Sequence, residues 1–288
     1  TIGEITQKPI TITGATSNDK IYDTTTEATV TGGSLVGVLG ADDVLLIQEG
    51  TFSTILAGGP YAVTSTCRIA GDDALNYSLV QPILPNASIN QKELTLKDVA
   101  TTDKVYDATN VAILTGGELL GLYPVDGPNV SFILSGYYAD ANIGNWTITS
   151  TTTLSGSASG NYYLTQPVFV VKKDITPLGL TVSGFTASNK PYDGNRDATV
   201  SVAGVSLVGV LGGQSVTLNS GSVTGAFDTK DIGTGKTVIA SGFYISGPDA
   251  SNYALTQPTT TANITTVALT ITADALSGCA GTFVTTGR

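Results

Sequence analysis

The chain of 288 residues contains no histidine, no methionine and only two cysteines. Without histidine, Ser–His and Cys–His nucleophile systems and the usual zinc sites are excluded. The sequence also has no Gly-Lys-Ser/Thr loop of the kind that binds nucleotide phosphates. We therefore expect a protein that is not an enzyme and that needs no cofactor, with calcium left open as an occasional ligand of single loops.

Basic residues and long apolar runs are scarce as well. Lys and Arg number 13 against 23 Asp and Glu, which gives a formal net charge of −10, and the basic residues form no cluster. Such an acidic chain is not expected to bind nucleic acid. Apolar runs such as Val168–Val171 are far shorter than the roughly 20 residues of a membrane-spanning helix, so we expect no membrane span.

The two cysteines do not follow the repeat described below. Cys67 and Cys279 are in non-equivalent positions, whereas a disulfide framework would recur with the period. Separate modules would also hold them farther apart than a disulfide allows. We expect a buried thiol at Cys67, and at Cys279 either a free thiol or one that pairs with another chain.

Two short motifs return three times along the chain, at one period. The first is Lys-x-Tyr-Asp, at offsets of 84 and 86 residues, and the second is Asn-Tyr, which opens a segment ending in Gln-Pro. Two markers at one period indicate tandem modules. The recurring residues are Lys20, Tyr22, Asp23, Asn76 and Tyr77; then Lys104, Tyr106, Asp107, Asn161 and Tyr162; then Lys190, Tyr192, Asp193, Asn252 and Tyr253.

The composition and the local patterns favour strands. Thr, Ser, Gly, Val and Ile abound, and segments such as Ile10–Thr13 alternate between apolar and polar residues. About seven short strands per period, separated by Gly, Pro, Asn and Asp, predict an all-β protein of three tandem immunoglobulin-like Greek-key β-sandwich modules in an extended array, with a small barrel as the alternative. The predicted modules are residues 9–91, 92–176 and 177–266.

The two flanks resemble incomplete modules. Residues 1–8 resemble the last strand of a module, and residues 267–288 begin like a first strand. We expect the chain either to belong to a longer array or to use these ends for assembly. Candidate assembly strands carry Ile2 and Ile5 at one end and Leu269 and Ile271 at the other. Any secretory signal is expected to have been removed or to lie upstream.

The recurring residues have plain structural interpretations. The tyrosines of Lys-x-Tyr-Asp are expected to fill the core edge with their hydroxyls on backbone, as in a tyrosine corner. The aspartates are expected to open turns and the lysines to pair with local carboxylates, an internal isopeptide bond being the alternative. The asparagines are expected in left-handed turns. Asp73 and Asp249, which precede two of them, raise the possibility of a calcium loop, but Ala158 takes that place in the second module.

The Lys-x-Tyr-Asp turn, the apolar Leu-x-Gly-Val segment and the closing Gly-x-Asp-Ala-x-Asn-Tyr-x-Leu together resemble the YDG-type repeat of very large bacterial surface proteins, including adhesins similar to filamentous haemagglutinin. One departure is that the glycine after Tyr-Asp is present only as Gly194, with Thr24 and Ala108 elsewhere. The resemblance implies secretion, an extracellular location at the cell surface and a stalk or adhesive role. It supplies no catalytic residues.

Three functions remain open at this point. The first is a structural and adhesive segment of a surface fibre, whose partners are neighbouring repeats and possibly host or surface glycans. The second is a filament subunit in which identical subunits polymerise by β-strand complementation. The third is a carbohydrate-binding module that uses the aromatic residues Tyr137, Tyr138 and Trp146.

Overall fold

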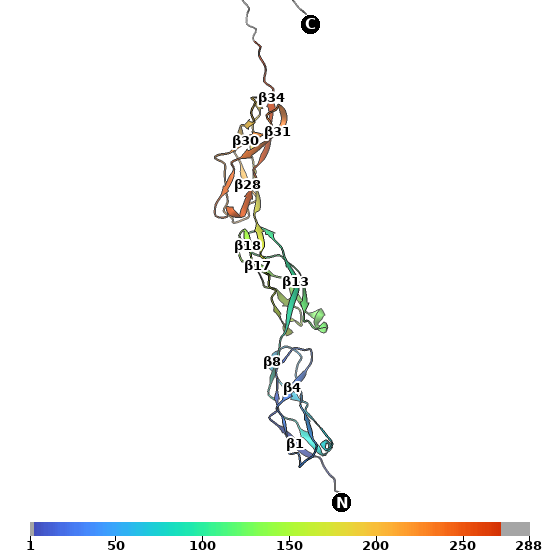
Figure 1. The fold of residues 1–288 in the computed structure, drawn as a ribbon. Helices are drawn as coiled ribbons and strands as arrows, with labels where there is room; N and C mark the ends of the chain where they lie inside the picture. Colours follow the sequence, from blue (N-terminus) through green and yellow to red (C-terminus); the bar gives the residue numbers. More distant parts are fainter. Residues whose placement is uncertain (1–2, 272–288) are drawn as a thin grey trace, which may run out of the picture. The chain divides into compact units, whose positions relative to one another are not determined.

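The computed structural model describes residues 3–271 and is built almost entirely of short β-strands with four short 3-10 turns (Figure 1). The predictions of an all-β, sandwich-like fold and of three tandem modules are confirmed by three equivalent sets of strand pairings. The described residues form two compact units that divide between Thr176 and Pro177; the first holds the first two modules and the second holds the third.

The strands are shorter and more numerous than the seven per module expected, because turns interrupt them. The first module contains β1 Lys8–Thr13, β2 Thr16–Ser17, β3 Lys20–Ile21, β4 Glu27–Thr31, β5 Ser34–Val36, β6 Leu45–Ile47, β7 Glu49–Phe52, β8 Gly58–Tyr61, β9 Val63–Ser65, β10 Arg68–Ala70, η1 Ala74–Asn76, β11 Tyr77–Val80 and β12 Ala87–Asn90. The second contains β13 Lys92–Thr101, β14 Lys104–Val105, β15 Leu114–Leu120, η2 Pro124–Asn129, β16 Ser131–Ile133, β17 Gly136–Tyr138, β18 Gly144–Trp146, β19 Ile148–Ser150, β20 Thr153–Ser155, η3 Ser159–Asn161, β21 Tyr162–Thr165 and β22 Lys173–Thr176. The third contains β23 Leu178–Ser183, β24 Thr186–Ala187, β25 Lys190–Pro191, β26 Asp197–Ala198, β27 Val200–Ser201, β28 Ser206–Val208, β29 Thr217–Asn219, β30 Thr224–Phe227, β31 Gly233–Ser241, β32 Tyr244–Ser246, η4 Ala250–Asn252, β33 Tyr253–Leu255 and β34 Thr259–Thr265.

Each module is closed by two parallel strand pairs. In the first module, β1 lies parallel to β11 and antiparallel to β5, while β12 lies parallel to β3 and antiparallel to β8. In the second module β13 pairs with β21 and β15, and β22 with β14 and β18, in the same senses. In the third, β23 pairs with β33 and β28, and β34 with β25 and β31. The beginning and the end of each module are therefore hydrogen-bonded into its sheets.

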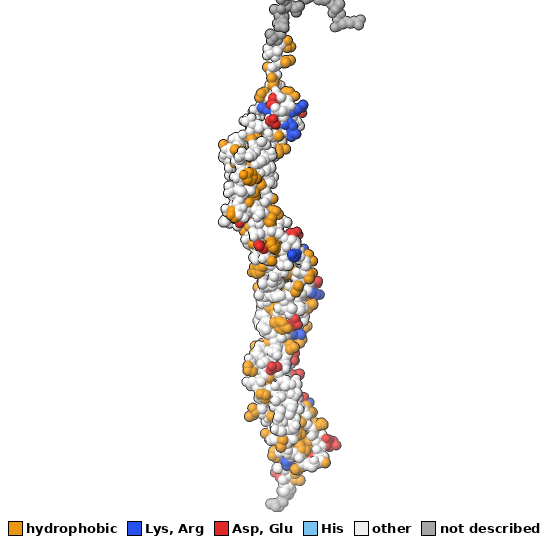
Figure 2. Space-filling view, turned by 60° about the vertical axis from the view of Figure 1, so that its left-hand side comes forward, with side chains coloured by type: hydrophobic (Ala, Val, Ile, Leu, Met, Phe, Trp, Pro, Cys, Tyr) orange, Lys and Arg blue, Asp and Glu red, His pale blue; other side chains and the backbone are white. Residues whose placement is uncertain are grey.

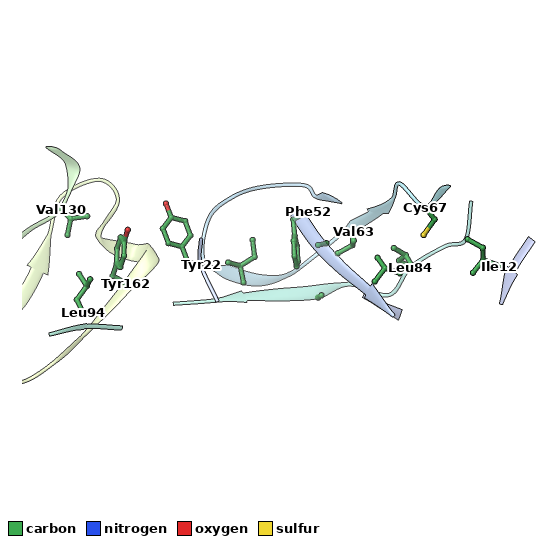
Figure 3. Close-up of a cluster of buried hydrophobic side chains, with 13 residues drawn as sticks. Ile12, Tyr22, Phe52, Val63, Cys67, Leu84, Leu94, Val130 and Tyr162 are labelled. Carbon is green, nitrogen blue, oxygen red and sulfur yellow. The ribbon is translucent and has the colours of Figure 1, made fainter. Parts of the chain in front are cut away.

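The core of the first module lies between these sheets and continues into the second. The alternating burial of β1 and β4 places one face of each strand inside. The buried cluster runs from Ile12 past Phe52 to Tyr22, and from there to Tyr162 and Leu94 of the second module (Figure 3). The third module has its own clusters, around Phe227 with Val238 and around Phe185 with Phe243.

The surface is poor in charge, as Figure 2 shows, with uncharged polar side chains and backbone between scattered charged residues. Cys67 is buried and unpaired, as expected, and Cys279 lies outside the described residues. In the described part of the chain, no helix has both the length and the apolar character needed to cross a membrane.

The candidate assembly segments carry exposed apolar side chains. Residues 3–7 and 266–271 form no strand, Ile5 is 99% exposed, and Leu269 and Ile271 are almost as exposed. Ile2 lies outside the described residues. Strand formation by these segments in an assembly stays a prediction.

Candidate functional site at the junction of the first two modules

The strand register places the two repeated motifs at opposite ends of each module. Lys8, the first residue of β1, pairs with Tyr77, so the Asn-Tyr motif lies where the chain enters the first module. Asn90, the last residue of β12, pairs with Ile21 and accepts a hydrogen bond from the backbone N–H of Tyr22 at 2.8 Å, so the Lys-x-Tyr-Asp motif lies where the chain leaves. Between modules one and two, a Lys-x-Tyr-Asp end therefore meets an Asn-Tyr end.

The lysine of the motif holds the turn that presents the tyrosine. Lys20 Nζ donates to Asp23 Oδ1 at 2.7 Å and to the carbonyl and hydroxyl oxygens of Thr25 at 2.8 and 3.1 Å. These three acceptors satisfy the three donors of the ammonium group. Its Nζ also lies 5.5 Å from the ring centroid of Phe52, at cation–π distance. The aspartate in turn accepts the backbone N–H of Thr25 at 2.9 Å, which fixes the turn.

The same turn recurs in all three modules. Lys104 binds Asp107 at 2.7 Å and lies over the Tyr138 ring, and Lys190 binds Asp193 at 2.8 Å and lies over Phe227. Burial alone would raise the pKa of the Asp23 and Asp107 carboxyls, but their hydrogen bonds to lysine and threonine outweigh it and lower the pKa. In Asp193 the hydrogen bond to Lys190 is the largest cause of a lowered pKa. Each lysine therefore forms an ion pair with the aspartate of its own turn.

The residue after Tyr-Asp keeps one backbone conformation whatever its type. Gly194 has φ +81°, and its counterparts Thr24 and Ala108 have φ +70° and +63°. A left-handed conformation is natural for glycine but costs other L-residues roughly 1–2 kcal/mol. The departure from the Tyr-Asp-Gly pattern therefore changes the strain of the turn and not its shape.

A buried carboxylate joins the first two modules. Asp126 of η2 is 8% exposed, and its Oδ2 accepts the hydroxyl of Tyr22 at 2.9 Å and that of Tyr162 at 2.6 Å. Tyr22 comes from the first module and is 2% exposed. Figure 3 shows its ring directed toward Tyr162, with ring centroids 5.4 Å apart and an edge-to-face angle of 78°. Hydrogen bonds to a charged acceptor are about twice as strong as neutral ones.

Three further contacts lie at this end of the second module. The backbone N–H of Ala57 donates to Asn161 Oδ1 at 2.9 Å, and Gln91 Nε2 donates to the carbonyl oxygen of Gly160 at 2.9 Å. Lys92 Nζ lies 4.9 Å from the ring centroid of Tyr123. A single residue, Gln91, separates β12 from β13. The junction is therefore a direct side-chain contact and not a flexible linker.

The two junction tyrosines stay protonated to high pH. Burial, then the hydrogen bond to Asp126, raises the pKa of Tyr22 to about 12. Burial and the hydrogen bond to the same carboxylate also raise the pKa of Tyr162. Both hydroxyls therefore act as donors, and Asp126 is the acceptor that they share.

The structure corrects two details of the expected motif roles. The Tyr22 hydroxyl does not bond backbone as in a tyrosine corner but reaches a carboxylate of the next module, and Tyr192 is 40% exposed. The motif asparagines end the 3-10 turns η1, η3 and η4 and are not left-handed. Asn161, one residue before the buried Tyr162, accepts the backbone N–H of Ala57 across the junction.

The acids that suggested a calcium loop have protein partners. Asp73 Oδ2 accepts the backbone N–H of Asp43 at 2.9 Å, and Asp249 Oδ2 accepts that of Ser215 at 2.7 Å. Each carboxylate thus ties two loops of its own module. Within residues 3–271, no group of three acidic or cysteine side chains is placed to hold a metal ion.

The three aromatic residues considered for sugar stacking do not form a common platform. Tyr138 is 1% exposed and donates its hydroxyl to the Thr102 carbonyl oxygen at 2.6 Å, so its ring belongs to the core and not to the exposed surface expected. Tyr137 is partly exposed, and Trp146 donates its indole N–H to the Asn142 carbonyl oxygen at 2.7 Å.

Sequence reasoning missed Asp126. It lies in the segment Pro124–Asn129, and Asp42 of the first module precedes it by 84 residues, the same offset that separates Lys20 from Lys104. The period therefore carried a signal for this acid, which the two repeated motifs did not include. A second signal was chemical: the aspartate lies inside an apolar, Gly- and Pro-rich segment, and buried tyrosines need an acceptor.

The repeated pairings and the junction define a tandem-repeat β protein in which the first two modules contact each other through recurring residues. A model of the YDG domain matches the chain three times, at residues 6–84, 90–168 and 176–262. The chain belongs to the YDG domain family. Comparisons with curated proteins and with solved structures found no match.

Proposed function

We propose that the chain is a non-enzymatic repeat segment of an extracellular bacterial surface fibre, in which YDG modules extend the protein away from the cell and contribute adhesive surface. The observation that carries the proposal is the Tyr22–Asp126–Tyr162 junction. Its recurring tyrosines serve contact between modules, which is what a stalk needs and what an isolated binding module does not.

The strand pairing supports a role under tension. The first strand of the first module, β1, is paired with β11 near its end, and the last strand, β12, is paired with β3 near its beginning. Both pairs are parallel, so a pull between the ends of the module acts along the strands. Their slanted, evenly spaced hydrogen bonds then share the load. The second module repeats both pairings.

The location is tested by labelling intact source cells with an antibody raised against the whole chain. Staining of intact cells that is lost after brief surface proteolysis is the expected result. Staining that requires cell lysis would contradict an extracellular location. Binding of the fluorescent chain to host cells or glycans, compared with a heat-unfolded sample, tests the adhesive part separately.

The mechanical role is tested by pulling single chains from their two ends. Each module has about 85 residues, so at 3.3–3.6 Å per residue its unfolded chain spans roughly 280–310 Å, and a complete unfolding event should lengthen the protein by that span less the folded length. Three such steps are expected. A gradual extension at low force would contradict load-bearing modules.

A filament subunit that polymerises by strand complementation is the second candidate. It is favoured by the exposed apolar residues Ile5, Leu269 and Ile271 in segments that form no strand within the described residues. Under this proposal, deletion of residues 1–7 should abolish polymers seen by electron microscopy. Polymers that persist after the deletion would rule this option out.

A further inference from the structure

The entry end of the first module repeats the receiving half of the junction. The Tyr77 hydroxyl donates to Asp42 Oδ2 and accepts the backbone N–H of Leu39 at 3.0 Å. In the second module the Tyr162 hydroxyl donates to Asp126 and accepts the N–H of Tyr123 at 3.4 Å. An acid, a tyrosine and a backbone N–H are thus arranged in the same way at both places.

Neighbouring contacts repeat as well. Gln7 Nε2 donates to the Leu75 carbonyl oxygen at 2.9 Å, as Gln91 does to that of Gly160 at the same distance. Gln7 directly precedes β1 and Gln91 directly precedes β13, and each of these strands is the first of its module. The backbone around Asp42 and Tyr77 is therefore already arranged as in a junction.

We define the receiving surface as Leu39, Asp42, Leu75, Asn76 and Tyr77; within the described residues Tyr77 is buried and the other four are not. Leu75 is 86% and Leu39 is 55% exposed. Asn76 is exposed, whereas its counterpart Asn161 is 4% exposed. Two apolar side chains therefore lie exposed beside the half-buried Asp42 carboxylate at this end of the module.

The third module carries the complementary half. Tyr192 occupies the place of Tyr22: its backbone N–H binds the last strand of its module at Thr265, and Lys190 and Asp193 hold the same turn. Its ring is 40% exposed, whereas the ring of Tyr22 is buried.

A second feature of the same end is Ile232. It follows Phe227 by five residues, as Ala57 follows Phe52, and both phenylalanines lie under the motif lysine. Ala57 contributes its N–H to the junction, and Ile232 is 53% exposed. Tyr192 and Ile232 together form the docking tip.

We propose that the receiving surface binds the docking tip of a second copy of this chain, with the Tyr192 hydroxyl donating to Asp42 and Ile232 packing against Leu75 and Asn76. The argument is continuity with the junction already present between the first two modules. Such a contact is head-to-tail, so it joins copies in one direction and does not close a two-fold dimer.

Association between separate copies is expected to be weak. The contact is a single junction without the short covalent connection that gives the first two modules a high effective concentration. Trapping by a reversible disulfide detects such contacts. In the known junction, Ala57 and Gly160 line one groove, and their counterparts are Ile232 and Leu75.

The experiment mixes two full-length variants, Leu75→Cys and Ile232→Cys, each also carrying Cys279→Ser, in a glutathione redox buffer. The buried Cys67 is left in place. The disulfide dimer that joins one variant to the other should form in higher yield than random pairing predicts from the yields of the two dimers of identical variants. Adding Tyr192→Phe to the Ile232→Cys chain should lower that excess about tenfold, because it removes one hydrogen bond to a carboxylate.

Tyr244→Phe in the same chain is the matched control, since Tyr244 is an exposed tyrosine of the same module outside the docking tip. It should leave the excess unchanged. Urea unfolding of the Tyr192→Phe chain should match its parent, which separates loss of docking from loss of fold. Dimer yields that match random pairing, or equal yields of the mixed dimer with and without the Tyr192 hydroxyl, would overturn the proposal. The receiving surface would then be assigned to contact with a module of the same chain.

Discussion

Removal of the Tyr22 hydroxyl should destabilise the second module, although Tyr22 belongs to the first. The Tyr22→Phe substitution keeps the ring against Tyr162 and deletes only the donor to Asp126, which lies 2.9 Å away. The acceptor is a buried carboxylate that keeps one other tyrosine donor, Tyr162. The change is therefore confined to one hydrogen bond.

The magnitude follows from the charge of the acceptor. A hydrogen bond to a charged group contributes about 1.5–3 kcal/mol, and a buried polar group left unsatisfied costs about 1–3 kcal/mol. We expect Tyr22→Phe to lower the free energy of unfolding by about 2 kcal/mol. Asp126→Ala, which leaves two buried hydroxyls without this acceptor, should lower it by about 3–5 kcal/mol. The double variant should show a coupling of about 1.5–3 kcal/mol between the two sites.

The chain offers a local probe for the assay. Trp146 is its single tryptophan and lies in β18 of the second module. Its fluorescence during urea unfolding reports on that module, while far-UV circular dichroism reports on all three. With a urea dependence of about 1–2 kcal/mol per M for a module of this size, the Trp146 midpoint should fall by roughly 1–2 M in Tyr22→Phe.

Tyr192→Phe is the matched control, because this tyrosine occupies the same motif position but is 40% exposed. At low protein concentration it should leave both transitions unchanged. If Tyr22→Phe moves neither the Trp146 transition nor the circular dichroism transition, the hydroxyl contributes nothing across the junction, and the reasoning fails.

Three further predictions concern the turn and its titrating groups. Thr24→Gly should raise the free energy of unfolding by about 1 kcal/mol, and Gly194→Ala should lower it by a similar amount in thermal unfolding, since both positions have a left-handed φ; opposite signs would show that this turn is not strained. The pKa of Asp107 is lowered in the folded state. Its contribution to the free energy of unfolding is therefore present above the unfolded pKa of about 3.9 and is lost as pH falls through the lower folded pKa. Between pH 2 and 5, the urea midpoint of Asp107→Asn should fall less steeply than that of the parent chain. The pKa of Tyr22 is raised to about 12 in the folded state. Its contribution to the free energy of unfolding is therefore complete below the unfolded pKa of about 10 and is lost as pH rises toward 12. Between about pH 10 and 12, Tyr22→Phe should lose less stability than the parent chain.

The sequence was sufficient for the fold class, because its signals are local and repeated three times. Period-two alternation predicted strands such as Ile10–Thr13, which the structure places within β1. The short two-residue strands were missed, since a run of two residues has no periodicity to read.

The junction required structure, because its partners are distant in sequence. Tyr22 and Asp126 are 104 residues apart, and the aspartate lies outside the repeated motifs. The motifs identified which tyrosines recur but not that their hydroxyls cross between modules. The sequence pattern shows which positions recur. It does not show which ends of neighbouring modules meet, because that depends on the parallel register of β1 with β11 and of β12 with β3.

The opposite placement of the two motifs within a module also bears on how such a gene can change in length. A recombination event that removes or duplicates one full period leaves every remaining module with one Lys-x-Tyr-Asp end and one Asn-Tyr end, wherever in the period the crossover falls. An event that removes a fraction of a period would leave one module without one of its two ends. Copy number can therefore drift while the geometry of each contact is inherited unchanged.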